Sequence, residues 1–141
     1  MNTIIAYVDG SYNDKIKKFS YGIVLLDNLQ QNIIYEDSHA YDNKDLISMR
    51  NVAGEIFGAT AAMQFAIDNK YDQIIIYYDY SGIEKWCTRE WKANKFGTIQ
   101  YRNYYDKIKN MINIQFIKVK AHTNNIYNDR ADNLAKKVLG L

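Results

Sequence analysis

The chain has 141 residues, which is enough for one domain with a buried core and too few for two. Because 48% of the residues are apolar, the composition excludes a disordered chain. The formal net charge of +2 is nearly neutral, so any basic surface for nucleic acid must be local. No apolar run could span a membrane, the N-terminus lacks the features of a signal peptide, and the single cysteine excludes an internal disulfide. We therefore expect a cytoplasmic protein with no membrane partner.

Residues 3–11 predict a buried strand that ends on an acid. The run is rich in Ile, Val and Tyr, and Gly10 and Ser11 are typical of turns. A carboxylate at the end of an apolar run is unfavourable unless a metal ion, a basic residue or a turn pairs with it. For Asp9 taken alone, the simplest interpretation is a hydrogen bond to its own turn.

Two more strands and a helix are predicted in the first half of the chain. A polar loop leads to a strand over 19–26, and a turn then leads to a third strand that begins at 32–36. Short connections favour antiparallel pairing of these three strands. Gly54 and Gly58, one turn apart in a predicted helix over 48–69, indicate that something approaches the helix backbone closely. The apolar residues of this helix recur at helical spacing and are Val52, Ile56, Ala59, Met63, Ala66 and Ile67.

The second half of the chain predicts a parallel continuation of the sheet. Residues 73–79 form an apolar run that again ends on an acid, Asp79. Because a helix precedes this run, a strand–helix–strand crossover favours parallel pairing beside the first strand. The remaining predicted elements are a strand over 114–119 and helices over 81–92, 98–111 and 129–139. Together they predict an α/β fold of three layers, in which helices cover both faces of a mixed five-stranded sheet, three strands antiparallel and then parallel ones.

Four acids fall where this topology brings them toward one end of the sheet, namely Asp9, Glu55, Asp79 and Asp132. Clustered carboxylates repel one another unless cations neutralise them. Oxygen ligands select Mg²⁺ or Mn²⁺, and two such ions roughly 4 Å apart can support phosphodiester cleavage. Taken singly, each acid has a simpler explanation. Asp132, placed in the first turn of its helix, would be a favourable N-terminal charge, Glu55 a solvated helix residue, and Asp79 a turn former.

Five motifs in a fixed order extend this interpretation. They are Tyr7-Val8-Asp9-Gly10-Ser11, Asn51-Val52-Ala53-Gly54-Glu55, Tyr77-Tyr78-Asp79, Lys120-Ala121-His122 and Asn128-Asp129-Arg130-Ala131-Asp132-Asn133-Leu134-Ala135. In these motifs the chain resembles type 1 ribonuclease H over nearly its whole length. Residues 82–95 are similar to the bacterial branch, which is often fused to a small hybrid-binding domain. We expect only a single catalytic domain here, over residues 1–141.

The resemblance implies a metal-dependent endoribonuclease that hydrolyses the RNA strand of RNA–DNA hybrids and leaves 5′-phosphate and 3′-hydroxyl ends. It implies two Mg²⁺ ions, with Mn²⁺ as an alternative, held by the four acids. Asp9 would bridge both ions. Asp132 would hold the ion that activates the attacking water, and Glu55 and Asp79 would hold the ion at the leaving 3′ oxygen.

Two further residues receive roles from the resemblance. His122 would lie on a mobile loop and assist proton transfer or product release, whereas without its motif it would be a solvated loop histidine. Asp129 would tune the water-activating metal site as an auxiliary acid, or would be an ordinary surface acid.

Residues implied to bind the hybrid are Gly10, Ser11, Asn51, Ser81, Trp91, Lys92 and Lys95. Asn51 would contact the RNA strand, with an N-terminal helix cap as the alternative. Trp91 and the two lysines would form a groove for the DNA strand, with an aromatic face against sugars and ammonium groups on phosphates. Trp86 could line this groove as well, but either tryptophan could equally be a core residue, and for Trp86 we expect the core.

Two departures from the family pattern bear on activity. The segment between Trp91 and Tyr101 is short and only mildly basic, which predicts modest affinity for the hybrid. Ala121 and Asn124 replace the usual glycines beside the histidine, so the mobility of that loop is an open question.

Three other functions remain open at this point. One is a module that binds hybrids or duplexes without cleaving them, although clustered acids oppose phosphate binding. Another is a nuclease of the same fold that acts on a DNA junction or on duplex RNA. The least specific is an α/β domain with scattered surface acids. No exposed apolar stripe stands out in the sequence, so we expect a monomer.

Overall fold

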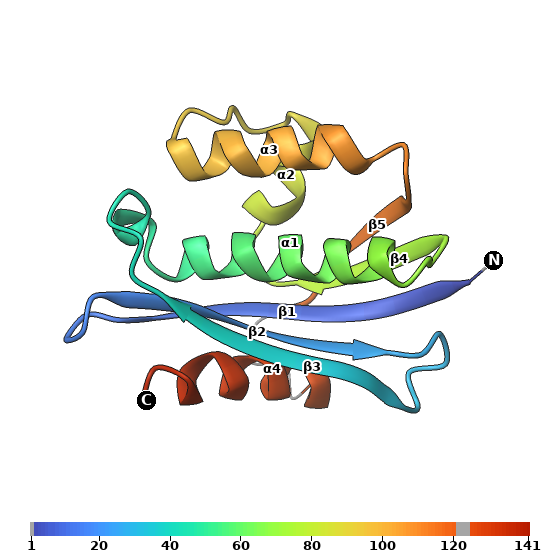
Figure 1. Ribbon diagram of the computed structural model, residues 1–141, viewed down its shortest axis with the longest axis horizontal. Coiled ribbons are helices and arrows are strands. Elements are labelled where there is room, and N and C mark those ends of the chain that lie inside the picture. Colours follow the sequence, from blue (N-terminus) through green and yellow to red (C-terminus); the bar gives the residue numbers. More distant parts are fainter. Residues whose placement is uncertain (1, 121–124) are drawn as a thin grey trace.

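The computed structural model describes residues 2–120 and 125–141. Figure 1 shows a sheet with α1, α2 and α3 on one side and α4 on the other. None of the helices in the described ranges is long and apolar enough to cross a membrane. The elements are the strands β1 (Thr3–Asn13), β2 (Lys18–Leu26), β3 (Ile33–Tyr41), β4 (Gln73–Tyr78) and β5 (Asn113–Lys118), and the helices η1 (Ile47–Met49), α1 (Asn51–Asp68), α2 (Gly82–Thr88), α3 (Phe96–Ile108) and α4 (Ile126–Lys137).

The sheet has the strand order β3-β2-β1-β4-β5. β2 pairs antiparallel with both β1 and β3, whereas β4 pairs parallel with both β1 and β5. The predicted α/β fold is therefore confirmed, with its mixed five-stranded sheet and helices on both faces. β1 is the central strand, so its side chains meet helices on either side.

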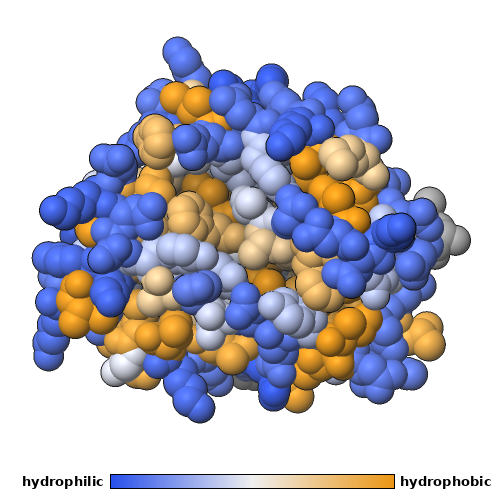
Figure 2. Space-filling model, in the orientation of Figure 1, coloured by the Kyte–Doolittle hydropathy of each residue, from blue (hydrophilic) through white to orange (hydrophobic). Residues whose placement is uncertain are grey.

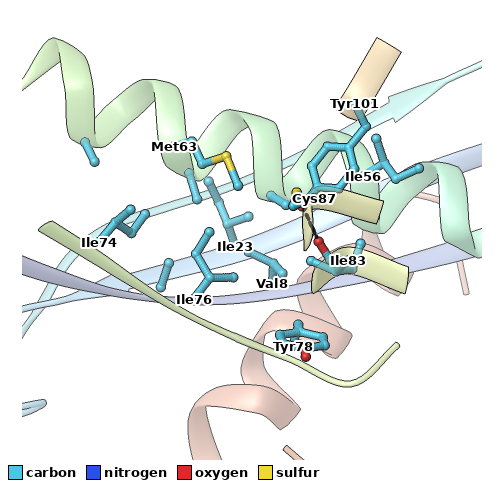
Figure 3. Close-up of a cluster of buried hydrophobic side chains, with 14 of the residues drawn as sticks. Val8, Ile23, Ile56, Met63, Ile74, Ile76, Tyr78, Ile83, Cys87 and Tyr101 are labelled. Carbon is cyan, nitrogen blue, oxygen red and sulfur yellow. Dashed lines mark hydrogen bonds between the residues drawn. The ribbon is translucent and has the colours of Figure 1, made fainter. Parts of the chain in front are cut away.

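The larger core lies between the sheet and α1 (Figure 3). Alternate residues of β4 enter it, namely Ile74, Ile76 and Tyr78, as the two-residue period of a strand requires. α1 packs on β1 and β2 and also contacts α3, so it is buried on two sides rather than along the single predicted stripe. Tyr101 of α3 donates its hydroxyl to the Ile83 carbonyl oxygen of α2 at 2.6 Å, which joins these helices over the core.

A smaller core lies on the opposite face, under α4. Ile5, Tyr7, Val24 and Leu26 point from the sheet toward Ala131. The helix lies very close to β2, because a Cβ on Gly22 would overlap the Ala131 carbonyl oxygen.

The predicted start of the long helix is wrong by three residues. η1 ends at Met49, the next residue Arg50 has a left-handed φ of 53°, and α1 begins only at Asn51. Arg50 is the N-cap residue, so the cap alternative for Asn51 is excluded. The change of backbone direction at Arg50 produces no periodic pattern of apolar residues. The sequence therefore does not reveal where the helix begins.

Candidate active site

The site lies where β1 extends beyond the end of its pairing with β4. β4 pairs with β1 only as far as Tyr7↔Tyr77, whereas β1 continues to Asn13 beside β2. The predicted turn at Gly10 and Ser11 is therefore wrong, because pairing with β2 carries β1 straight through both residues. Asp9 lies on the part of β1 that β4 leaves uncovered. Asp79 follows directly after β4, at the same end of the sheet.

Glu55 reaches this place because α1 packs unusually close to β1 and β2. A Cβ on Gly54 would overlap the Ser20 carbonyl oxygen, and a Cβ on Gly10 would overlap the Asn51 carbonyl oxygen. Glycine at both positions lets the first turns of α1 lie directly on the strands. The predicted close approach at Gly54 is confirmed. As a result, Glu55 is a buried acid with only 2% of its surface exposed.

Three carboxylates come together at this point. One oxygen each from Asp9, Glu55 and Asp79 lies within 4.8 Å of the other two. Asp9 and Glu55 are buried, whereas Asp79 is partly exposed, so the group opens to solvent on one side. The sequence prediction that these acids converge is correct for this trio.

The electrostatics of the group are unfavourable without a cation. Desolvation, and then the charges of Asp79 and Asp132, raise the pKa of Asp9 to about 8, although the Gly10 N–H donates to its carboxylate at 2.8 Å. Desolvation, followed by the charges of Asp79 and Asp9, raises the pKa of Glu55 well above its ordinary value. Glu55 Oε2 is buried and has no hydrogen-bond partner among the described residues. Buried carboxylate oxygens that repel one another fit hard divalent cations such as Mg²⁺ or Mn²⁺.

Asp132 lies on α4, near these three carboxylates, and its surroundings differ from theirs. α4 begins at Ile126, because the Asn125 side chain accepts hydrogen bonds from two N–H groups of the first turn. Asp132 therefore lies in the second turn and not, as predicted, in the first, which removes the helix-terminus explanation for its charge. Its carboxylate is near enough to raise the pKa of Asp9. It also pairs with Lys136 Nζ at 3.0 Å.

The other predicted site residues lie in different surroundings. Gly10 and Ser11 are buried in β1, Asn51 is exposed at the first position of α1, and Ser81 is a partly buried N-cap of α2. Asp129 is exposed in the first turn of α4. His122 lies outside the described residues.

A groove of about 300 Å³ separates the start of α1 from the segment between α2 and α3. Trp91 is 37% exposed and packs edge-on against Trp86, which is buried, as expected of a core residue. Lys85 Nζ lies 5.7 Å from the centre of the Trp91 ring. Lys92, the next residue in the chain after Trp91, is exposed. The groove is lined by Ser48, Met49, Val52, Tyr80, Trp86, Trp91, Asn94, Lys95 and Thr98.

Sequence reasoning missed several of these neighbours. Tyr80 and Asn94 line the groove, but no period or motif distinguishes them before the fold is known. Lys136, by contrast, stands four residues after Asp132, and that spacing on a helix is a standard signal for an ion pair.

An apolar hollow lies elsewhere on the surface. It holds about 390 Å³ between α1 and α3 and is lined by no charged side chain. Figure 2 shows this face of the molecule, with blue side chains around a paler, recessed area. The hollow lacks the charged groups that phosphodiester chemistry needs, so the carboxylate group is the better candidate for an active site.

Comparison with known proteins identifies the family of the chain. Residues 1–139 match the family RNase H. Ribonuclease H of Francisella tularensis subsp. novicida is 30% identical, over 98% of this chain and 91% of the relative. Ribonuclease H of Ehrlichia ruminantium is 28% identical, over 96% of this chain and 94% of the relative.

Solved structures share the fold at lower identity. RNase H1 from Halobacterium salinarum superposes with a TM-score of 0.80 at 23% identity and covers 98% of both chains. LC11-RNase H1, solved in complex with an RNA/DNA hybrid, has a TM-score of 0.78 at 18% identity and covers 97% of this chain and 96% of its own. The expected resemblance is confirmed by the match over nearly the whole sequence, and the chain belongs to the RNase H family.

Proposed function

We propose that this chain is a metal-dependent endoribonuclease that hydrolyses the RNA strand of RNA–DNA hybrids, giving 5′-phosphate and 3′-hydroxyl ends. The observation that carries the proposal is the group of Asp9, Glu55 and Asp79, with one oxygen each within 4.8 Å. Membership of the RNase H family and the hybrid bound to the related LC11-RNase H1 support the choice of substrate. We propose that residues 1–141 act as one catalytic domain and as a monomer.

The donor set fits divalent cations, and we propose two of them. Asp9, Glu55, Asp79 and Asp132 would hold them, since three of these carboxylates lie together and the charge of Asp132 also acts on Asp9. When bound, Mg²⁺ or Mn²⁺ ions activate a water and stabilise the leaving oxygen. The protein's part is to hold these carboxylates in place and partly screened from solvent. Burial screens Glu55, and the hydrogen bond from the Gly10 N–H fixes the Asp9 carboxylate and favours its ionised form.

Recognition of a hybrid requires contacts to 2′-hydroxyls on one strand and to a DNA backbone on the other. Asn51 is exposed one turn before Glu55, where it can meet the RNA strand together with Gly10, Ser11 and Ser81. The groove with Trp91 and Lys95 offers an aromatic face and a cation to the second strand, and Lys92 adds another cation. His122 would move a proton near the reacting phosphate.

One gel assay tests this function. A single end-labelled RNA is presented as single strand, RNA duplex and RNA–DNA hybrid, each with Mg²⁺, Mn²⁺ or chelator. We expect cutting of the hybrid alone, and only with metal. Asp9→Asn should abolish cutting while hybrid binding survives, and the exposed Asp45→Asn should cut like the wild type. Cleavage of duplex RNA instead would identify another nuclease, and an active Asp9→Asn protein would refute the role of Asp9.

A further inference from the structure

Gln30, in the turn between β2 and β3, joins three tyrosines from three different elements. The Tyr7 hydroxyl donates to Gln30 Oε1 at 2.8 Å, and Gln30 Nε2 donates to the Tyr77 hydroxyl at 3.4 Å. The Tyr127 hydroxyl donates to the backbone carbonyl oxygen of Gln30 at 3.2 Å. One turn residue thus binds β1, β4 and α4 at the same time.

The same three elements supply candidate metal ligands. Tyr7 precedes Asp9 by two residues in β1, so these two side chains lie on the same face of the sheet. Tyr77 is in β4, two residues before Asp79, which follows the end of that strand. The rings of Tyr7 and Tyr77 stack at 4.6 Å with an angle of 12° between their planes, and the Tyr127 ring lies 5.6 Å from that of Tyr7. Tyr127 stands five residues before Asp132 on α4.

The turn is built to hold Gln30 in place. Its φ of 54° is left-handed, a conformation that is strained for a non-glycine residue. Asp27 braces the turn, because its carboxylate accepts from the Gln31 N–H at 2.8 Å and from Asn32 Nδ2 at 3.0 Å. Glycine would adopt this φ without strain but would lose both side-chain hydrogen bonds.

We propose that Gln30 is a positioning residue of the candidate active site, which fixes Asp132 on α4 relative to Asp9 and Asp79. The proposal rests on the proposed function. Without this link, the start of α4 is freer to move against β1, and Asp132 remains paired with Lys136. Metal binding and turnover should then weaken together. Affinity for the hybrid should be unchanged, because the groove lies between the start of α1 and the segment between α2 and α3, whereas the hydrogen bonds of Gln30 given above go to β1, β4 and α4.

The test compares three variants of the full chain. Gln30→Gly removes the side chain and keeps the backbone conformation. Gln30→Glu is the conservative rescue, since a carboxylate accepts from both phenols. Leu29→Ala is the matched control, because Leu29 is 71% exposed in the same turn. Mn²⁺ affinity is measured by calorimetry, and kcat and KM for the hybrid are measured well below each melting temperature.

We expect Gln30→Gly to weaken Mn²⁺ binding and lower kcat by about fivefold to tenfold, as loss of one or two hydrogen bonds predicts, with KM within about twofold. Gln30→Glu should recover most of the Mn²⁺ affinity and most of kcat, and Leu29→Ala should match the wild type in both quantities. A Gln30→Gly protein with a lower melting temperature but normal Mn²⁺ affinity and kcat would overturn the proposal, since its role would be structural only.

Two outcomes separate this inference from the function on which it rests. If the wild type binds Mn²⁺ but cleaves no hybrid, the proposed function fails, and a loss of Mn²⁺ affinity in Gln30→Gly would still support the positioning role. If Gln30→Gly does not fold, Tyr127→Phe removes only the bond to the Gln30 carbonyl and keeps the ring. Unchanged Mn²⁺ affinity and kcat in that folded variant would then overturn the inference.

Discussion

The stability of the metal-free protein should fall as pH rises, and Asp9 should be the main cause. Its carboxyl has a pKa raised from the ordinary 3.8 to about 8 in the folded chain, through desolvation and the charges of Asp79 and Asp132. Between those two values the folded state binds more protons than the unfolded state. The free energy of unfolding therefore decreases with pH in this window, and the stabilisation is fully present only below about pH 4.

The magnitude follows from the width of the window. One proton held by the folded state alone gives a slope of about 1.4 kcal/mol per pH unit, or about 4 kcal/mol between pH 5 and pH 8. Asp79 and Asp132 are partly exposed, and solvent near them weakens the repulsion. We therefore expect the free energy of unfolding to decrease by about 2 kcal/mol between pH 5 and pH 8. Glu55, whose pKa is also raised by burial, acts in the same direction.

The assay is urea unfolding at pH 5 to 8.5 in metal-free buffer, for the wild type and for Asp9→Asn. The difference between the two proteins reports on Asp9 together with its effect on Glu55, because the charge of Asp9 also raises the pKa of Glu55. Asp9→Asn should show a shallower pH dependence and should be the more stable protein at pH 8. Saturating Mg²⁺ should flatten the wild-type curve and stabilise it by about 2.7 kcal/mol at a hundred times its Kd. Parallel curves for the two metal-free proteins would refute the reasoning about Asp9.

Two further predictions concern packing and the groove. Gly54→Ala should destabilise the protein by about 3 kcal/mol or more in urea unfolding, because the new Cβ overlaps the Ser20 carbonyl oxygen; a neutral effect would show that α1 can move away from β2. Trp86→Ala should cost about 3–5 kcal/mol of stability, whereas Trp91→Ala, at a 37% exposed position, should cost under about 1 kcal/mol and raise KM for the hybrid severalfold. Equal stability losses for the two tryptophans would contradict this division.

Local sequence patterns were sufficient to predict the type and order of the helices and strands, but not the residues at which they begin and end. Strands and helices carry apolar periods, so their type and order follow from sequence, and the order then gives the sheet topology. Gly10 failed as a turn signal because it serves a tertiary contact, the approach of the Asn51 carbonyl, rather than a change of direction. The start of α4 failed because Asn125 caps it from within a polar stretch that has no period.

The candidate site could be predicted only in part for a similar reason. The trio of Asp9, Glu55 and Asp79 follows from topology and resemblance together. The Asp132–Lys136 ion pair follows from helical i,i+4 spacing once both residues are placed in one helix, whereas the hydrogen bonds around Gln30 link residues far apart in the chain and leave no local pattern.

The acid group owes its chemistry to a difference in strand length. β4 ends at Tyr78, while β1 continues to Asn13, so the edge of β1 beyond Tyr7 is free to meet Glu55 and Asp79. Packing of the two cores must outweigh the repulsion among these acids in the metal-free chain. The same repulsion is relieved when divalent cations bind, so the electrostatic energy that destabilises the fold becomes affinity for metal. A longer β4 would cover Asp9, and the fold would gain stability and lose the site.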